Sequence, residues 1–183
     1  MSKLSSLIDR MTTVTQQLRV FARSRNNETQ RIDLKKAIEE TLVAMQPILA
    51  GSNVESFIET PPEPVWVMAG RVRIEQVLVN LLKNAIDAMQ ETGEQSQKHV
   101  YIKLRPTDNH RVELSVADTG PGIKEEVINS LFEPFESTKP SGQGMGLGLA
   151  ISNSIIAEIK GEMRAENRAE GGALFTILID GAD

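Results

Sequence analysis

The sequence predicts an α+β fold, a two-layer α/β sandwich with a mixed sheet covered on one face by three helices and preceded by one long helix. Three observations lead to this fold class. Apolar residues recur at helical spacing over residues 34–49, 71–90 and 146–160. Short stretches of alternating apolar and polar residues separate them, as expected for strands. A heptad-like apolar stripe occupies residues 4–21.

Length and composition limit the classes of protein to consider. The chain has 183 residues, which suits one domain with an appendage. It contains no cysteine, so disulfides and cysteine-based metal sites are excluded. The net charge of −5 argues against a nucleic-acid partner. No apolar run reaches 18 residues, so the sequence predicts no membrane-spanning helix.

The first stretch predicts a long helix that needs a partner, because its apolar residues form one seam. We interpret it as half of a helical hairpin or as a dimer interface; the alternative is a helix that lies on its own domain. Residues 24–27 end it and link it to the rest of the chain. The seam consists of Leu4, Leu7, Ile8, Met11, Val14, Leu18 and Phe21.

The next elements begin and end at recognisable residues. Asp33 is expected to cap a helix over residues 34–49, and Gly51 is expected to stop it. Short strands are predicted over residues 54–60 and 65–68. The proline-rich segment 61–64 between them prevents regular pairing of the two strands with each other.

A second helix is predicted over residues 71–90, and it carries an unusual polar stripe. Asn80, Asn84 and Asp87 fall on one side of the helix among leucines. Buried asparagines are costly unless they bind something, and carboxamide and carboxylate oxygens suit a hard cation such as Mg²⁺ that also takes phosphate ligands. The alternative is that the stripe is the exposed edge of an amphipathic helix.

A predicted hairpin over residues 100–104 and 111–117 leads directly into Asp118-Thr119-Gly120-Pro121-Gly122-Ile123. Glycines on both sides of a proline favour a rigid turn where the backbone can meet a flat ligand. A carboxylate buried at Asp118 could accept a hydrogen bond from an exocyclic amine such as that of adenine. The alternative is that Asp118 only forms the turn.

The stretch from residue 131 to 150 predicts a mobile lid. A short helix over residues 124–130 precedes it, and Phe132 and Phe135 are expected to anchor it. Glycines then open a third helix that Gly161 stops, and free N–H groups at such a helix start favour a bound phosphate. The alternative is a flexible loop before an ordinary helix. A hairpin over residues 162–168 and 173–179, turned at residues 170–172, completes the chain.

Several of these motifs occur together in the order typical of one family. They are residues 80–85 (NLLKNA), residues 118–122 (DTGPG), Phe132 with Phe135, residues 144–149 (GMGLGL) and residues 172–175 (GALF). Over about residues 30–180 the chain resembles the catalytic, ATP-binding domain of two-component sensor histidine kinases. These kinases belong to a superfamily that they share with gyrase, the ninety-kilodalton chaperone and mismatch-repair ATPases. Within the kinase family, the motifs look most like sensors of the nitrogen-regulation and C4-dicarboxylate-transport type.

The resemblance implies a role for each motif residue. Asn84 would coordinate Mg²⁺, with Asn80 contacting the metal or a phosphate through water, and Lys83 and Asp87 would face the phosphates. The adenine end would comprise Asp118, Gly120, Gly122 and Ile123. The lid and its glycine box would comprise Phe132, Phe135, Lys139, Gly144, Met145, Gly146, Leu147, Gly148 and Leu149.

The resemblance also implies the reaction and its partners. The chain would bind ATP or ADP with Mg²⁺ and transfer the γ-phosphate to a histidine upstream of residue 4, for relay to an aspartate of a response regulator. Residues 1–27 would be the second helix of the dimerisation and phosphotransfer hairpin, which forms a homodimer in the intact protein, and residues 28–183 the catalytic domain. The chain would be the cytoplasmic portion of an inner-membrane sensor, with any membrane contact made by an upstream region.

Two departures from the family refine this expectation. Hydrolytic relatives have a glutamate where this chain has Asn80, and an asparagine cannot take a proton from water. Transfer to another acceptor is therefore favoured over hydrolysis. His99 and His110 lie in the strand region without an acceptor motif, so we expect that this chain cannot phosphorylate itself. The alternatives are a non-catalytic nucleotide-gated dimerisation or binding module, and an ATPase of the gyrase or chaperone type.

Overall fold

The computed structural model describes residues 29–90, 97–134 and 146–182. Its main sheet has five strands in the order β2-β4-β5-β7-β6. Strand β2 runs parallel to β4, whereas the other neighbouring strands are antiparallel, so the sheet is mixed, as predicted. The strands are β2 (Glu55–Glu59), β4 (His99–Pro106), β5 (Arg111–Asp118), β7 (Ala173–Asp180) and β6 (Glu162–Asn167).

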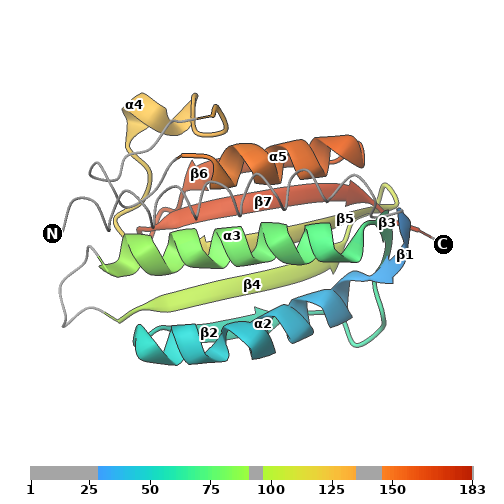
Figure 1. Ribbon diagram of the computed structural model, residues 1–183, viewed down its shortest axis with the longest axis horizontal. Coiled ribbons are helices and arrows are strands. Elements are labelled where there is room, and N and C mark those ends of the chain that lie inside the picture. Colours follow the sequence, from blue (N-terminus) through green and yellow to red (C-terminus); the bar gives the residue numbers. More distant parts are fainter. Residues whose placement is uncertain (1–28, 91–96, 135–145, 183) are drawn as a thin grey trace, which may run out of the picture.

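Three helices lie side by side on one face of this sheet, with α3 between α2 and α5 (Figure 1). They are α2 (Leu34–Gly51), α3 (Arg71–Gln90) and α5 (Gly148–Glu158); a single turn, α4 (Glu125–Ile128), lies above the sheet in this view. Alternation along β4 and β5 sends one set of side chains toward the helices. That set is buried and includes Val100, Ile102, Leu104, Val112, Leu114 and Val116. The predicted two-layer sandwich is therefore confirmed.

A small second sheet was not predicted. Strand β1 (Gln30–Asp33) pairs antiparallel with β3 (Trp66–Ala69), and an isolated bridge joins Val67 to Gly181. The N–H of Ala182 donates to the carbonyl of Trp66 at 2.8 Å. The first and the last described segments therefore meet beside β3. As predicted, β3 does not pair with β2.

Helix α2 begins where the sequence indicated. The Oδ1 of Asp33 accepts hydrogen bonds from the N–H of Lys35 (3.1 Å) and of Val65 (3.2 Å). This carboxylate satisfies one of the donors left open at the helix start and also ties the loop before β3 to it.

The two predicted glycine stops work differently from the expectation. At the end of α5 the N–H of Lys160 donates to Ala157 and that of Gly161 to Ile156, both at 2.9 Å, which is a Schellman motif. The left-handed residue is Lys160 (φ 59°), and Asn53 (φ 53°) has the same place after α2. Gly161 is needed for space instead, because a Cβ there would lie 2.8 Å from Ile156 Cγ2 and 2.9 Å from the Leu178 carbonyl oxygen.

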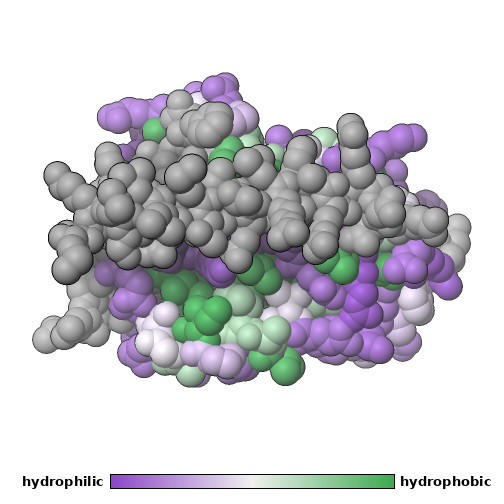
Figure 2. Space-filling model, in the orientation of Figure 1, coloured by the Kyte–Doolittle hydropathy of each residue, from purple (hydrophilic) through white to green (hydrophobic). Residues whose placement is uncertain are grey.

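The predicted helix over residues 4–21 lies outside the described residues, as does the rest of the unit 1–27. Among the described helices, none combines the length and the apolar character that crossing a membrane requires. Apolar side chains are exposed at Val43 and Ile48 of α2, and Figure 2 shows green surface among hydrophilic residues in the lower part of the view, where α2 lies.

The two glycines provide a matched test of the packing after α5. We expect Gly161→Ala to lower the free energy of unfolding by about 1–3 kcal/mol, because the new methyl group would meet backbone that cannot move aside. Gly51→Ala should be neutral or stabilising by up to about 1 kcal/mol, since Gly51 ends a helix and a Cβ there meets nothing within 4 Å. Urea unfolding measures both; equal effects of the two substitutions would contradict the packing argument.

Candidate functional site

The polar stripe of α3 is held against the start of α5. Asn80 is half-buried, and its Nδ2 donates to the carbonyl of Gly148 and to Oγ of Ser152, both at 3.1 Å. Because a carbonyl oxygen can only accept, the amide nitrogen must be the atom that faces α5. The hydroxyl of Ser152, which is fully buried, donates in turn to Gly148 at 2.9 Å. The three groups form a closed triangle that fixes the first residue of α5 on α3.

The other two members of the stripe, Asn84 and Asp87, follow Asn80 at helical spacing on the same side of α3, and Lys83 precedes Asn84. Asn84 is half-buried, and within the described residues its carboxamide makes no hydrogen bond. Lys83 and Asp87 are exposed. Asn80 is thus held between α3 and α5, whereas the roles of Asn84 and Asp87 stay predictions.

Asp118, at the end of β5, is the most deeply buried carboxyl group in the described part of the chain, with 3% of the residue exposed. Its Oδ1 accepts from the N–H of Gly120 at 2.8 Å and from that of Ala173 at 3.2 Å. Its Oδ2 makes no hydrogen bond within the described residues. Asp118 is therefore more than a turn former, since one oxygen is fixed by the fold and the other remains as an acceptor.

Burial raises the pKa of Asp118 above its ordinary value, because loss of water disfavours the charged form. The amides of Gly120 and Ala173 and the positive charge of Arg168 oppose this increase in pKa. The guanidinium of Arg168 donates through Nη1 to the carbonyl of Asp118 at 2.7 Å. The carboxyl group is thus desolvated but electrostatically supported from the β6–β7 hairpin.

The turn after Asp118 lies against the C-terminal half of α3. A Cβ on Gly120 would lie 3.3 Å from Cβ of Ala88, so helix and turn are in direct contact. From Asn80 to Ala88 the helix rises about 12 Å. One side of α3 therefore connects the start of α5 with the turn that contains Asp118, and Asn84 lies midway between them.

The remaining predicted site residues fall into two groups. Ile123, Phe132 and Leu149 are half-buried and pack against the core, and Gly146 has a left-handed backbone (φ 65°) just before Leu147 and α5. The N-cap position, Leu147, offers no side-chain cap to the helix. Outside the described residues lie Phe135, Lys139, Gly144 and Met145.

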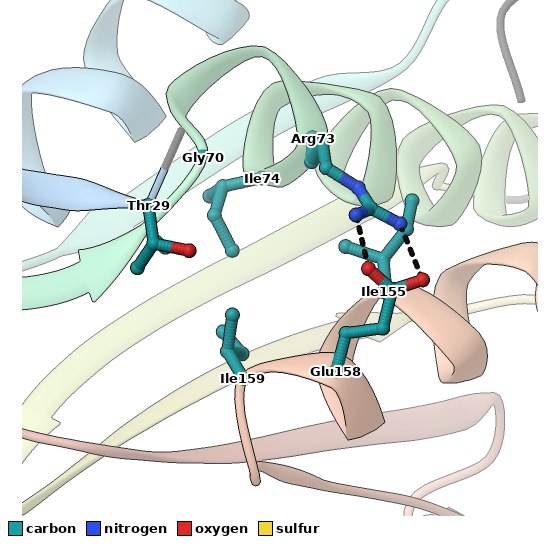
Figure 3. A pocket seen from close by; sticks show the side chains of 8 residues that line it. Thr29, Gly70, Arg73, Ile74, Ile155, Glu158 and Ile159 are labelled. Carbon is teal, nitrogen blue, oxygen red and sulfur yellow. Dashed lines mark hydrogen bonds and ion pairs between the residues drawn. The ribbon is translucent and has the colours of Figure 1, made fainter. Parts of the chain in front are cut away.

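A hollow of about 60 Å³ lies at the opposite end of α3, between α3, α5 and Thr29 (Figure 3). Arg73 and Glu158 meet there in a two-point ion pair, with Nη2 and Oε1 2.8 Å apart. The pair ties the start of α3 to the end of α5. Because its two charged groups are paired with each other, this hollow is a weaker candidate than the side of α3 near Asp118.

A wider hollow, of about 620 Å³, lies on the sheet face away from the helices. Its charged groups are also paired: Lys103 lies 2.7 Å from Glu59, and Arg105 lies 2.8 Å from Glu113. Because these charges are mostly exposed, screened by solvent and already paired, this hollow is also a weaker candidate than the side of α3 near Asp118.

Three residues of the site were missed by the sequence analysis. Ser152 could have been found, because it is a polar residue four positions after Gly148 in an apolar helix. Asn167 and Arg168, at the end of β6, gave no signal, since their importance comes from contacts with residues 44 and 50 positions away.

Comparison with known proteins gives consistent results. Residues 69–183 match the family described as histidine kinase-, DNA gyrase B- and HSP90-like ATPase. The chain is 34% identical over 174 residues to the C4-dicarboxylate transport sensor protein DctB of Pseudomonas aeruginosa, covering 95% of this chain and 28% of that protein. The chain therefore spans about a quarter to a third of the length of curated relatives such as DctB and FixL.

Solved structures of histidine kinases have the same fold as the described part of this chain. The nucleotide-free catalytic domain of histidine kinase ThkA superposes with a TM-score of 0.73 at 36% identity, covering 84% of this chain and 95% of that domain. ThkA in complex with the response regulator TrrA gives a TM-score of 0.72 at 28% identity, covering 99% of this chain and 52% of that chain. The predicted resemblance is confirmed: the chain belongs to the family of histidine kinase-, DNA gyrase B- and HSP90-like ATPases, with the fold of a sensor histidine kinase catalytic domain.

Proposed function

We propose that this chain is the ATP-binding catalytic part of a sensor histidine kinase. It binds ATP with Mg²⁺ and transfers the γ-phosphate to a histidine upstream of residue 4. The observation that carries the proposal is the buried Asp118, whose Oδ1 is fixed by backbone amides and whose Oδ2 has no hydrogen bond within the described residues. The second oxygen is the acceptor for the adenine amine.

The two ends of the proposed site have different chemistry. The adenine lies at the Asp118 turn with Gly120, Gly122 and Ile123. The phosphates lie toward the start of α5, where the N–H groups of Gly148 and Leu149 and the helix dipole favour negative charge. The separation of about 12 Å along α3 suits a ligand with a base at one end and a phosphate chain at the other.

Asn84 fits a Mg²⁺ ligand, because it presents a half-buried carboxamide without a hydrogen bond in the described structure. The described residues contain no cluster of three or more His, Cys, Asp or Glu side chains that could hold a metal without phosphate ligands. When bound, Mg²⁺ would neutralise phosphate charge. Asn80 would contact the metal or a phosphate through water by its Oδ1, because its Nδ2 already donates to α5. The phosphates would also be faced by Lys83 and Asp87 of α3, and by Lys139 and the glycine box of the lid.

Phosphoryl transfer fits this site better than hydrolysis. Asn80 stands where hydrolytic relatives have a base, and both of its described hydrogen bonds use the amide nitrogen. A carboxamide cannot take a proton from water, so the site can position a phosphate but has no base at this position to activate water. This favours a kinase over an ATPase of the gyrase or chaperone type.

The acceptor is proposed to lie elsewhere in the intact protein. The ring of His99 contacts the Tyr101 hydroxyl at 3.2 Å and Glu55 at 3.5 Å on the β2–β4 side of the sheet, and His110 is in the β4–β5 turn. Residues 1–27 would be the second helix of a dimerising hairpin, and the domain 28–183 would act in the cytoplasm beneath a membrane-bound sensor. A response regulator is the proposed final acceptor, as the ThkA–TrrA complex suggests by analogy.

The adenine assignment predicts the effect of one isosteric substitution. Asp118→Asn should weaken ATP and ADP binding at least tenfold, because the amide would turn a donor toward the adenine amine. Isothermal titration calorimetry with Mg²⁺ measures this, and we expect wild-type affinity in the micromolar to millimolar range. Asp108→Asn, in the exposed β4–β5 turn, removes the same charge and should leave the affinity unchanged. Unchanged affinity of the Asp118 variant would refute the adenine assignment.

Burial of Asp118 predicts a pH effect on stability. Its pKa is raised in the folded chain, so the folded state keeps a proton that the unfolded state loses near the ordinary value of 3.8. The contribution of Asp118 to the free energy of unfolding is therefore fully present below pH 3.8, and it is lost as the pH rises through the raised pKa. Relative to Asp118→Asn, the wild type should lose stability as pH increases from about 4, and the difference should become constant above the raised pKa. Parallel urea-unfolding profiles between pH 4 and 8 would contradict this.

The kinase proposal predicts transfer in trans. With γ-labelled ATP the chain alone should remain unlabelled, whereas an added hairpin fragment that carries the acceptor histidine should gain an acid-labile label. Tight nucleotide binding without transfer would favour the alternative of a non-catalytic nucleotide-gated module. Label on His99 or His110 would show that the acceptor has been misplaced.

A further inference from the structure

The β6–β7 hairpin holds the turn after β5 through Asn167, the last residue of β6. Oδ1 of Asn167 accepts from the N–H of Ile123 at 2.6 Å, and its Nδ2 donates to the carbonyl of Ile123 at 2.8 Å. One carboxamide thus engages both backbone groups of one residue. Rotation of the Asn167 side chain would break both hydrogen bonds together.

The fit around this contact is close. Gly122, just before Ile123, has a left-handed backbone (φ 82°), and a Cβ there would lie 2.7 Å from Oδ1 of Asn167. A glycine is therefore required for the carboxamide to reach the chain at this point. The path of residues 122–123 is set by the position of Asn167.

The same hairpin also holds the other end of the turn. Arg168 donates to the carbonyl of Asp118, and the N–H of Ala173 donates to its Oδ1. From the opposite side, Oγ1 of Thr119 accepts from the N–H of His99 at 3.0 Å. Residues 118–123 are thus fixed at Asp118, at Thr119 and at Ile123, and Asn167 is the side chain that fixes the end of the turn far from the strand.

We propose that Asn167 is a positioning residue for the adenine end of the site. It holds Gly122 and Ile123 in place before the ligand arrives, so that the base meets a preformed surface. A turn that must be ordered on binding reduces affinity, and preorganisation removes that cost. The inference rests on the proposed function, because it assumes that adenine binds beside Asp118. Asn167 is remote from the proposed phosphate end, which lies at the start of α5.

Two variants test it by calorimetry with Mg-ATP and Mg-ADP. Asn167→Ala removes both hydrogen bonds, and Asn167→Asp keeps the shape but places an oxygen against the carbonyl of Ile123. Both variants should lower the affinity for ATP and the affinity for ADP by the same factor, about tenfold, so the ratio of the two affinities stays constant. Glu166→Gln, the exposed neighbour on β6, is the control and should bind as the wild type does.

Several results would overturn the inference. Wild-type nucleotide affinity in either Asn167 variant would do so. A changed ratio of ATP affinity to ADP affinity would also do so, as would an equal loss of affinity in Glu166→Gln. Amide hydrogen exchange of the wild type, without nucleotide, is decisive even where a variant does not fold. The Ile123 amide should exchange slowly. Exchange at the rate of an unstructured peptide would show that Asn167 does not hold Ile123 in place. Failure of the wild type to bind any nucleotide would instead refute the proposed function.

Discussion

The burial of the Asp118 carboxyl group is the constraint on which the rest of the site depends. A carboxyl group removed from water costs several kcal/mol unless hydrogen bonds replace its hydration. Here the hydrogen bonds come from the amides of Gly120 and Ala173, and the positive charge of Arg168, which donates to the Asp118 backbone carbonyl, also supports the carboxyl group. Two of these three groups belong to the β6–β7 hairpin, so that hairpin must lie next to β5. At Gly172 the approach is so close that a Cβ would stand 1.9 Å from the Asp118 carbonyl oxygen.

The opposite end of the site depends on a second polar contact with a different purpose. Asn80 ties the first residue of α5 to α3 through Gly148 and Ser152, whereas Arg73 and Glu158 tie the other end of α5 to the start of α3. Helix α5 is thus held at both ends against α3. The helix start that faces the proposed phosphates is fixed from α3, independently of the turn that faces the adenine. A substitution at one end can therefore change affinity without moving the other.

Most of the regular elements could be predicted from the sequence, because they follow from local periodicity. The bounds predicted for α3, residues 71–90, match those in the structure, since an unbroken apolar face defines them. Strand β1 was missed because four residues with mixed polarity carry no period. The site residues Asn80, Asn84 and Asp118 could be found as polar groups in apolar surroundings. Asn167 and Arg168 could not, because their contacts join segments distant in sequence and leave no local pattern.

The small ribbon of β1 and β3 has a consequence for how such a domain is joined to others. Because β1 and the segment around residue 181 both pair with β3, the described fold begins and ends at the same corner (Figure 1). That corner is at the end of the sheet away from the turn after β5. Modules fused before or after the domain would share one attachment point, and linkers there could be lengthened, exchanged or closed into a permuted chain without crossing the binding side.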